Sequence, residues 1–236
     1  MRLEETEIGI RLEETAIEII NTEVEFEQPV INMTYKFAKR AIDVVGALVG
    51  LFLLGLVLIP FSFFYSVGNN KGPIFFKQQR VGQDGKVFKI YKFRSMIENA
   101  EEVLKKDELL YRKYVTNNYK LEPTEDPRIT LFGQFIRKTS LDELPQFINV
   151  LKGEMSLVGP RPLIEIELNE YKEKKTVLLS AKPGMTGYWQ ICGRSDIHYP
   201  ERVEIELHYV YHQSILFDLM ILCKTIIQVL MRKGAY

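Results

Sequence analysis

The chain has 236 residues, enough for one large or two small domains, and its 31 Lys and Arg balance 31 Asp and Glu. Its two cysteines, Cys192 and Cys223, lie far apart without a CxxC or Cys/His pattern, which argues against a disulfide framework and a structural zinc site. The charge is uneven, because residues 1–30 hold nine Glu against two Arg. The remainder is therefore basic and suits anionic partners such as phosphates, nucleotides or a membrane surface.

An acidic N-terminal extension is predicted over residues 1–34. It contains a short repeat, RLEETEIGI followed by RLEETAIEI, and offers little apolar surface to bury. We interpret it as a solvated segment that is partly disordered or weakly helical. It lacks the basic start and the cleavage site that are typical of a signal peptide.

A membrane anchor is predicted over residues 35–70. Its uncharged run from Val44 to Val67 would form a helix about 36 Å long, against a hydrocarbon core of about 30 Å. Pro60 lacks an N–H and clashes with the carbonyl of Leu56, so we expect a break there, and the Ser62 hydroxyl could satisfy a freed backbone group. A re-entrant helix fits this pattern best, and a single span with a Pro kink is the alternative.

Basic residues flank the anchor on both sides, with Lys36, Lys39 and Arg40 before it and Lys71, Lys77 and Arg80 after it. Because Lys and Arg are retained on the cytoplasmic side of a membrane, this double excess favours both ends in the cytoplasm. The remaining residues, 71–236, are then predicted to form one cytosolic domain.

A β-hairpin is predicted in FFKQQRVGQDGKVFKIYKFRSM, residues 75–96, because hydrophobic and polar residues alternate around Asp84-Gly85. Lys92 and Arg94 near its end could bind phosphate, or they could belong to a solvated strand face. The segment has neither the GxxxxGK[ST] spacing of a P-loop nor a GxGxxG motif. A nucleotide bound here would therefore need side-chain cations.

Three further arginines stand next to conspicuous residues: Arg128 follows Asp126-Pro127, Arg137 precedes the octet TSLDELPQ, and Arg161 lies between Pro160 and Pro162. Proline fixes φ on both sides of Arg161, so less entropy is lost when its guanidinium binds a phosphate through two hydrogen bonds. A rigid surface turn is the alternative. The stretch KPGMTGYWQICGR, residues 182–194, offers glycines for close backbone approach and Trp189 for stacking, although a packed turn would have the same composition.

The octet TSLDELPQ, residues 139–146, sets Asp142 beside Glu143. Ser140 and Glu143 have the spacing of a capping box, in which both side chains bond the backbone at the start of a helix. Asp142 would then lie in the first helical turn, where the helix dipole favours negative charge. The octet alone therefore favours a structural role over a catalytic one.

The C-terminal part of the chain is predicted to be helical. His208 and His212 are four residues apart and lack a third metal ligand, so we interpret them as residues of an amphipathic face. Residues 214–231 are apolar apart from Asp218, Lys224 and a few neutral polar residues. They predict a helix that lies in the membrane interface or packs on the anchor.

Five motifs follow one another in a characteristic order: KFRSM (92–96), DPRIT (126–130), TSLDELPQFINVLKGEMSLVGPRP (139–162), PGMTGYWQICGR (183–194) and GAY (234–236). Through these motifs the chain, from about residue 35 onward, resembles the bacterial sugar transferases, the monotopic polyprenyl-phosphate phosphoglycosyl transferases that start glycan assembly on a lipid carrier. The resemblance implies an α+β fold. In it a re-entrant membrane helix joins a cytosolic, mainly helical catalytic domain with a small β-hairpin and interfacial amphipathic helices.

The resemblance also implies a reaction. A nucleotide diphosphate sugar, expected to be a UDP-hexose, gives its sugar 1-phosphate to undecaprenyl phosphate and leaves UMP, as the initiating step of exopolysaccharide, capsule, O-antigen or glycoprotein glycan synthesis. Asp142 would attack the β-phosphorus and hold the phosphosugar covalently. Asp142 and Glu143 would bind Mg²⁺, which neutralises the diphosphate, and Glu143 would support this site or the movement of protons.

The phosphate- and nucleotide-binding residues implied by the resemblance are Lys92, Arg94, Arg128, Arg137, Pro160, Arg161, Gln190 and Arg194. The implied location is the cytoplasmic face of the bacterial inner membrane. UDP-sugar, undecaprenyl phosphate and membrane lipids are the expected partners, with downstream glycosyltransferases and an oligomer as further options and no nucleic acid. A membrane-tethered scaffold without catalysis and a phosphotransferase for soluble substrates are the alternatives. The motifs do not identify the sugar, for which we expect galactose or glucose while N-acetylated sugars stay open.

Overall fold

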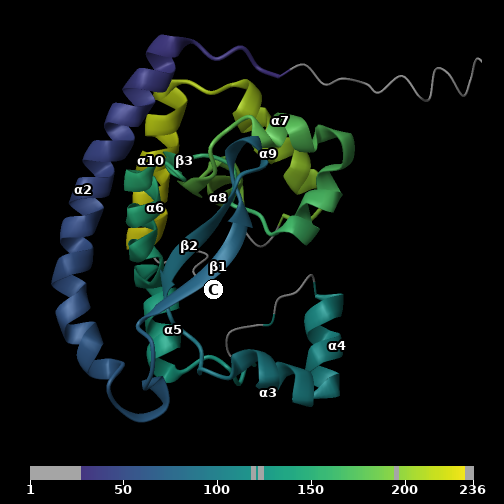
Figure 1. Cartoon of the computed structure of the whole chain (residues 1–236). Coiled ribbons are helices and arrows are strands. Elements are labelled where there is room, and N and C mark those ends of the chain that lie inside the picture. Colours follow the sequence, from purple (N-terminus) through teal and green to yellow (C-terminus); the bar gives the residue numbers. More distant parts are fainter. Residues whose placement is uncertain (1–27, 118–120, 122–124, 194–196, 232–236) are drawn as a thin grey trace, which may run out of the picture.

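A long apolar helix begins the described part of the chain. The computed structural model describes residues 28–117, 121, 125–193 and 197–231, so most of the predicted acidic extension lies outside the described residues. Helix α2 runs Met33–Phe64, and the Asn32 side chain caps it by accepting the backbone N–H of Thr34 at 2.9 Å. Figure 1 shows α2 curving along one side of the molecule. Within the described residues, α2 is the one helix long and apolar enough to cross a membrane.

Pro60 lies inside α2, because the helix continues past it to Phe64. The Ser62 hydroxyl donates to the carbonyl of Ile59 at 2.6 Å rather than to that of Leu56, which is the carbonyl that a proline at position 60 deprives of a helical partner. The helical hydrogen bonding therefore resumes after Pro60, since one missing hydrogen bond need not end a helix, and the break expected there stays a prediction. Re-entry of α2 into the same membrane face stays a prediction.

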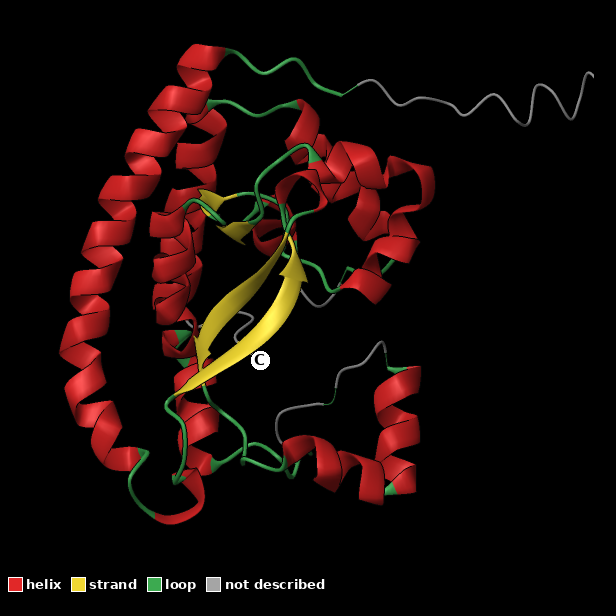
Figure 2. Cartoon of the chain, in the orientation of Figure 1, coloured by secondary structure: helices red, strands yellow, loops and turns green. Residues whose placement is uncertain are grey.

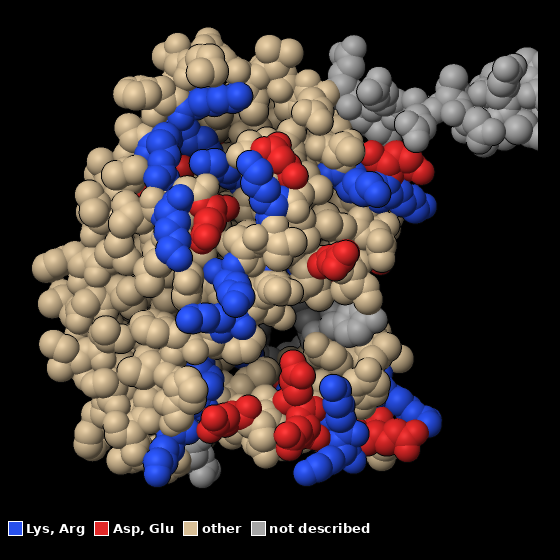
Figure 3. All heavy atoms as spheres, viewed as in Figure 1, with Lys and Arg blue, Asp and Glu red and all other residues tan. Residues whose placement is uncertain are grey.

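One stripe of α2 packs on the rest of the chain, while the opposite face is exposed. Ala47, Gly50 and Leu54 are buried at helical spacing. Gly50 lies so close to the Phe147 ring that a Cβ there would be 2.2 Å from it, so only glycine permits this contact. The outer face exposes large apolar side chains such as Ile59, which is 78% exposed. In Figure 3 most of the edge formed by α2 carries no charged side chain.

The predicted hairpin is confirmed. Strand β1 (Phe75–Val81) pairs antiparallel with β2 (Val87–Phe93) in a register that sets Arg80 opposite Phe88. The turn between them needs positive φ at Asp84 (56°) and Gly85 (75°), a conformation that Asp and Gly adopt more readily than other residues. Figure 2 shows this ribbon crossing the centre of a mostly helical molecule.

The other elements complete an architecture in which helices dominate. In chain order they are α3 (Ala100–Lys106), α4 (Glu108–Thr116), α5 (Leu131–Lys138), a 3₁₀ segment (Leu141–Gln146), α6 (Phe147–Lys152), β3 (Ser156–Val158), a second 3₁₀ segment (Glu165–Lys174), α7 (Lys175–Leu179), β4 (Gly184–Thr186), α8 (Tyr188–Cys192), α9 (Glu201–Tyr211) and α10 (Ile215–Leu230). Strands β3 and β4 form a short parallel pair that the sequence did not predict. The described residues thus agree with the expected mainly helical domain with a small hairpin.

Two hydrophobic clusters hold these elements together. The larger one includes Val150, Met155 and Val210, each 0% exposed, and joins α6, β3 and α9. The smaller one joins α2 to β2 and α5 through Leu54, Phe61, Phe93 and Ile136. The hairpin contributes to both clusters, through Phe88 and Ile90 to the larger and through Phe93 to the smaller.

Helix α10 packs on the first turns of α2, as one of the two predicted alternatives required. Lys39 and Asp218 form a buried ion pair at 2.7 Å, and the Tyr35 hydroxyl donates to the same carboxylate at 3.0 Å. The outward face of α10 exposes Leu216 and Leu230, and α5 exposes Leu131. These apolar faces are compatible with the expected interfacial helices.

Candidate active site

Asp142 and Glu143 lie in the 3₁₀ segment Leu141–Gln146, but no capping box forms. Ser140 adopts a left-handed conformation, with φ at 56°, and its side chain makes no capping hydrogen bond. The Glu143 carboxylate instead accepts a hydrogen bond from Lys92 Nζ at 2.7 Å. The predicted capping box is therefore wrong, whereas Asp142 does lie in the first turn of a helical segment, as expected.

The local sequence explains why the two carboxylates point outward together. Leu141 and Leu144, three residues apart, pack on the cluster around Phe93 and Ile136. A 3₁₀ helix has three residues per turn, so these leucines share one side and the two intervening residues face elsewhere. The pair Asp142 and Glu143, called the dyad below, is thus oriented by the leucines on either side of it.

The register of the hairpin brings Lys92 to the dyad. Residues paired across an antiparallel ribbon point to the same face, so Lys92, opposite Phe76, shares a face with Gln78 and Arg80 on β1. Of the basic residues on the two strands, Arg80 and Lys92 share this face, whereas Lys77 and Lys89 lie on the other. Lys92 is 26% exposed and Glu143 37% exposed at the side chain, so their ion pair is open to solvent.

Asp142 is a half-buried carboxyl among charges of both signs. The pKa of Asp142 is raised to about 6, mainly by burial and in part by the negative charge of Glu143. The cations of Lys92 and Arg137 act in the opposite direction on that pKa. A carboxylate held in a partly desolvated site between two cations has the environment of a reactive group rather than of a surface acid.

Arg137 approaches the dyad from the end of α5. Its Nε donates to Ser95 Oγ at 2.8 Å, which orients the guanidinium, and burial lowers its pKa while Asp142 opposes this change. Helix α5 can lie this close to Ser95 because residue 133 is glycine, where a Cβ would be 1.8 Å from the Ser95 carbonyl oxygen. The structure thus brings together Lys92, Arg137, Asp142 and Glu143 from the predicted site.

Arg94 and Arg128 have structural partners instead. Arg94 donates to the carbonyls of Asn70, Pro73 and Met96, and it fixes the loop between α2 and β1. Arg128 is 7% exposed and donates to both carboxylate oxygens of Asp126 at 2.8 Å. The geometry therefore gives these two predicted phosphate ligands roles in holding loops.

Arg161 projects from a turn that the two short strands support. Gly159 donates to Thr186 at 2.9 Å and Gly184 donates to the Pro160 carbonyl at 2.8 Å, so Pro160 is buried and the turn is fixed. The Arg161 guanidinium lies 5.9 Å from the centre of the Trp189 ring. This arrangement sets a rigid cation beside a flat ring, a proximity that the sequence did not predict.

The last two predicted binding residues are less informative. Gln190 lies in α8, half-buried, and its Oε1 has no hydrogen-bond partner within the described part of the chain. Arg194 lies outside the described residues, as does the terminal GAY motif. Their assigned roles stay predictions.

Three charged residues near Arg161 were not predicted as site residues. Arg80 on β1 is close enough to Arg161 and Glu143 for the charges of both to change its pKa. Arg202 and Glu206 on α9 lie behind the turn, 3% and 1% exposed. Their four-residue spacing in ERVEIELHY was visible in the sequence, but ordinary surface ion pairs have the same spacing.

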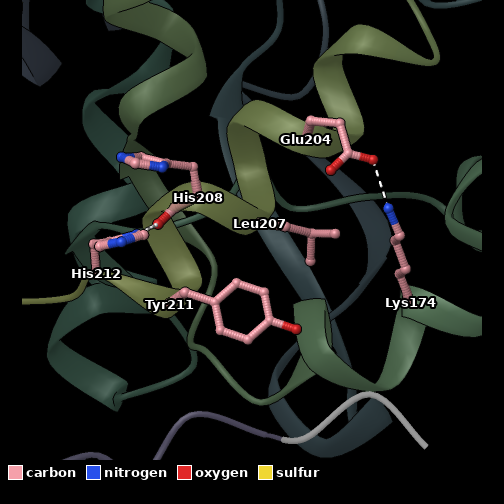
Figure 4. A pocket seen from close by; sticks show the side chains of 6 residues that line it. All are labelled: Lys174, Glu204, Leu207, His208, Tyr211 and His212. Carbon is pink, nitrogen blue, oxygen red and sulfur yellow. Dashed lines mark hydrogen bonds and ion pairs between the residues drawn. The ribbon is translucent and has the colours of Figure 1, made fainter. Parts of the chain in front are cut away.

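A shallow depression of about 380 Å³ lies elsewhere, along α9. Figure 4 shows its lining, with the Glu204–Lys174 ion pair at one end and the two histidines at the other. His208 and His212 stack with ring centres 4.2 Å apart, and His212 Nδ1 lies 2.8 Å from the His208 carbonyl oxygen. None of the predicted catalytic or phosphate-binding residues lines this depression.

The chemistry of the dyad is compatible with Mg²⁺. Within the described residues no three His, Cys, Asp or Glu side chains converge as a metal cage. Magnesium commonly uses only one or two protein carboxylates and takes its other ligands from water and substrate phosphates. Asp142 and Glu143 therefore fit as a partial site that a diphosphate would complete.

The comparison with protein families decides the assignment. The sequence profile of the family described as "Bacterial sugar transferase" matches residues 34–232. The chain belongs to the bacterial sugar transferase family. The resemblance found in the motifs is thereby confirmed, and the extension before residue 34 lies outside the match.

Curated proteins from other bacteria are similar to this family member. They include the undecaprenyl-phosphate galactose phosphotransferase of Salmonella typhimurium, 47% identical over 204 residues, which are 85% of this chain and 42% of that protein. The exopolysaccharide production protein ExoY of Sinorhizobium fredii is 43% identical over 84% of this chain and 88% of its own length. The UDP-glucose:undecaprenyl-phosphate glucose-1-phosphate transferase of Escherichia coli is 39% identical over 85% of this chain and 42% of its length. The chain thus spans less than half of the first and third proteins and most of ExoY.

Proposed function

We propose that this sugar transferase moves a hexose 1-phosphate from a UDP-hexose to undecaprenyl phosphate and thereby starts the synthesis of a polysaccharide. The names of the Salmonella and Escherichia relatives support the lipid acceptor and the sugar-phosphate donor. The name of ExoY, which this chain nearly spans, supports a role in exopolysaccharide production. The observation that carries the proposal is the Asp142 carboxyl, half-buried between Lys92 and Arg137.

The reaction proceeds in two displacements at phosphorus. An Asp142 carboxylate oxygen bonds to the β-phosphorus of UDP-hexose while the bond from that phosphorus to the bridging oxygen breaks, so UMP leaves with the bonding electrons. A phosphate oxygen of undecaprenyl phosphate then attacks the same phosphorus and releases Asp142. The products are UMP and undecaprenyl diphosphate hexose, and Asp142 is regenerated.

The neighbouring cations make the first displacement feasible. Lys92 and Arg137 lower the repulsion between the Asp142 carboxylate and the anionic diphosphate, and Arg161 binds the nucleotide part of the donor. Mg²⁺ held by Asp142 and Glu143 would neutralise charge on the diphosphate. Because phosphoryl transfer depends mainly on positioning and charge stabilisation, few other groups are needed.

The exposed apolar face of α2 explains why the site belongs at a membrane. The sugar nucleotide is soluble, whereas the acceptor phosphate lies at the depth of the lipid headgroups. A helix that enters and leaves the cytoplasmic face of the inner membrane would hold the dyad at that depth. Labelling of single cysteines placed near residues 30 and 70, in a chain without Cys192 and Cys223, tests this topology, and periplasmic reactivity on one side only would establish a span.

Transfer of label tests the function itself. Purified enzyme is incubated with UDP-hexoses carrying ³²P in the β-phosphate, Mg²⁺ and undecaprenyl phosphate, and the lipid fraction is counted. We expect label in the lipid and release of unlabelled UMP with one or more sugars. A membrane-tethered scaffold would transfer nothing, and a phosphotransferase for soluble substrates would work equally well without the lipid.

A further inference from the structure

The backbone of the Pro-Arg turn, residues 160–163, is bonded from two other parts of the chain. The Glu206 carboxylate on α9 accepts the backbone N–H of Arg161, with its two oxygens 3.3 and 3.2 Å from the nitrogen. On the other side, Arg80 Nη1 donates to the Pro162 carbonyl at 3.0 Å. Next to it, Val81 donates to the Leu163 carbonyl at 2.9 Å. Hydrogen bonds thus fix the backbone at the N–H of Arg161 and at the carbonyl of the next residue, Pro162.

Glu206 is itself held in place by its surroundings. It is 1% exposed and lies 3.6 Å from Arg202, whose guanidinium lies 4.1 Å from the centre of the Trp189 ring and 5.0 Å from that of Tyr199. Burial raises the pKa of Glu206 to about 7, which shows that this position is unfavourable for a negative charge. A buried carboxylate of this kind is weak evidence for stability, because an apolar side chain would often be at least as stable there.

Arg80 is also in an unfavourable position. Its pKa is lowered to about 10, mainly by burial and in part by the positive charges of Arg161 and Arg202. Its Nη2 donates to Gln78 at 2.6 Å, and Nη1 lies 3.5 Å from Glu167. Gathering three guanidinium groups beside two carboxylates costs folding free energy, and an anion bound there would offset part of that cost.

We propose that Arg80 and Glu206 are positioning residues, which hold the Pro-Arg turn so that Arg161 meets the phosphates of the nucleotide without rearrangement. This inference rests on the proposed function and deepens it, because it assigns two further residues to donor binding. Neither residue needs to touch the donor. Each acts by fixing the backbone on one side of Arg161, which reduces the entropy lost when its guanidinium binds.

A double-mutant cycle separates positioning from general support of the fold. Arg80→Met, Arg161→Ala and the double variant are compared in the full-length enzyme, measuring KM for the UDP-sugar, kcat, and Kd for UDP with Mg²⁺. If Arg80 acts through Arg161, Arg80→Met alone raises KM and Kd by about tenfold, and adds less than about twofold once Arg161 is alanine. A residue that only stabilises the fold would change KM and Kd by the same factor in the wild-type and Arg161→Ala backgrounds.

Arg40→Met is the matched control. Arg40 also donates to two backbone carbonyls, those of Val150 and Leu151, at 2.7 and 2.8 Å, and neither belongs to the Pro-Arg turn. Its effects should combine independently with Arg161→Ala. Should Arg80→Met fail to fold, Arg80→Lys replaces it, because one ammonium cannot reproduce the separate bonds to Pro162 and Gln78. Its effect on KM should likewise vanish in the Arg161→Ala background.

The outcomes distinguish the two proposals. Wild-type enzyme that transfers sugar phosphate, combined with independent effects of Arg80 and Arg161, overturns the positioning role and leaves the proposed function intact. A folded Arg80 variant with wild-type KM and Kd overturns it as well. Wild-type enzyme that neither binds UDP nor transfers label overturns the proposed function and this inference with it.

Discussion

Arginines in two regions of this molecule differ in their partners: in one region they bind acceptors of the protein itself, and in the other they lie at the candidate active site. Arg94, just after β2, donates to backbone carbonyls, and Arg128, before α5, donates to the buried Asp126 carboxylate. Around the dyad, Arg137 faces Asp142, and Arg161 projects beside Trp189 from a turn whose backbone other residues fix. All four were predicted from the sequence to bind phosphate or nucleotide. Only the second pair has the neighbours that catalysis would use.

This difference shows that an arginine next to a proline or an acidic motif does not necessarily bind phosphate. A guanidinium has five donors in a fixed plane, and internal acceptors that match this plane bind it as firmly as a phosphate would. The two regions should therefore respond differently to substitution. Loss of an arginine should cost stability in one and turnover in the other.

The largest effect is expected for Arg128→Met. It removes the partner of Asp126, whose side chain is 2% exposed, and leaves an uncompensated buried charge. We expect the free energy of unfolding to fall by about 3–5 kcal/mol, as for other broken buried ion pairs. Denaturant titration measures this. Adding Asp126→Leu should restore much of the loss, and activity per folded molecule should stay close to wild type; a stable Arg128→Met enzyme without activity would place Arg128 in the second region.

Arg161→Lys should have the reverse effect. The substitution keeps the charge but loses the planar guanidinium, so transfer should fall by about 10²-fold while the unfolding midpoint stays unchanged. Steady-state transfer assays and thermal unfolding of the same preparation check both halves. Wild-type kinetics in this variant would show that the Pro-Arg turn is a structural feature and that the Arg161 guanidinium is not needed to bind the donor.

A smaller effect with a defined pH dependence is expected for Glu206→Gln. The pKa of Glu206 is about 7 in the folded protein and about 4.5 when unfolded. As pH rises from below 4.5, the unfolded chain loses this proton first, so folding stability falls until about pH 7 and then levels off. Glutamine does not titrate, so it makes no pH-dependent contribution to the stability. The variant should therefore gain about 1–3 kcal/mol over wild type between pH 5 and pH 8, at about 1.4 kcal/mol per pKa unit. A difference in unfolding free energy that is constant with pH, or that has the opposite sign, would contradict this.

Much of the architecture could be predicted because its signals are local. The Asp84-Gly85 turn specified the hairpin, and an uncharged run of apolar residues specified α2. The left-handed Ser140 could not be predicted, because the Ser-x-x-Glu spacing is equally typical of a cap. Likewise, a missing N–H at Pro60 predicts a defect in a helix, and packing of the flanking turns decides whether the helix ends.

The residues of the candidate site could be predicted from the sequence, but which of them bind substrate and which bind other parts of the chain could not. Asp142, Glu143 and Arg161 could be named from motifs, whereas the bonds that occupy Arg94 come from carbonyls in separate loops. Arg80 contacts Pro162 across 82 positions, and Glu206 contacts Arg161 across 45. Such partners are set by the fold, so neither spacing nor composition identifies them.

The central claim is that Asp142 forms a covalent phosphosugar, and mass spectrometry of the trapped enzyme tests it most directly. Enzyme is mixed with a UDP-hexose and Mg²⁺ without lipid acceptor, quenched in acid and digested, and the peptide containing Asp142 is examined. We expect the mass of a hexose phosphate on this peptide, its loss on adding undecaprenyl phosphate, and its absence in a folded Asp142→Asn variant, because a neutral amide oxygen is a poor nucleophile toward phosphorus. Wild-type enzyme that turns over without any adduct, or Asp142→Asn enzyme with a near-normal rate, would contradict the account.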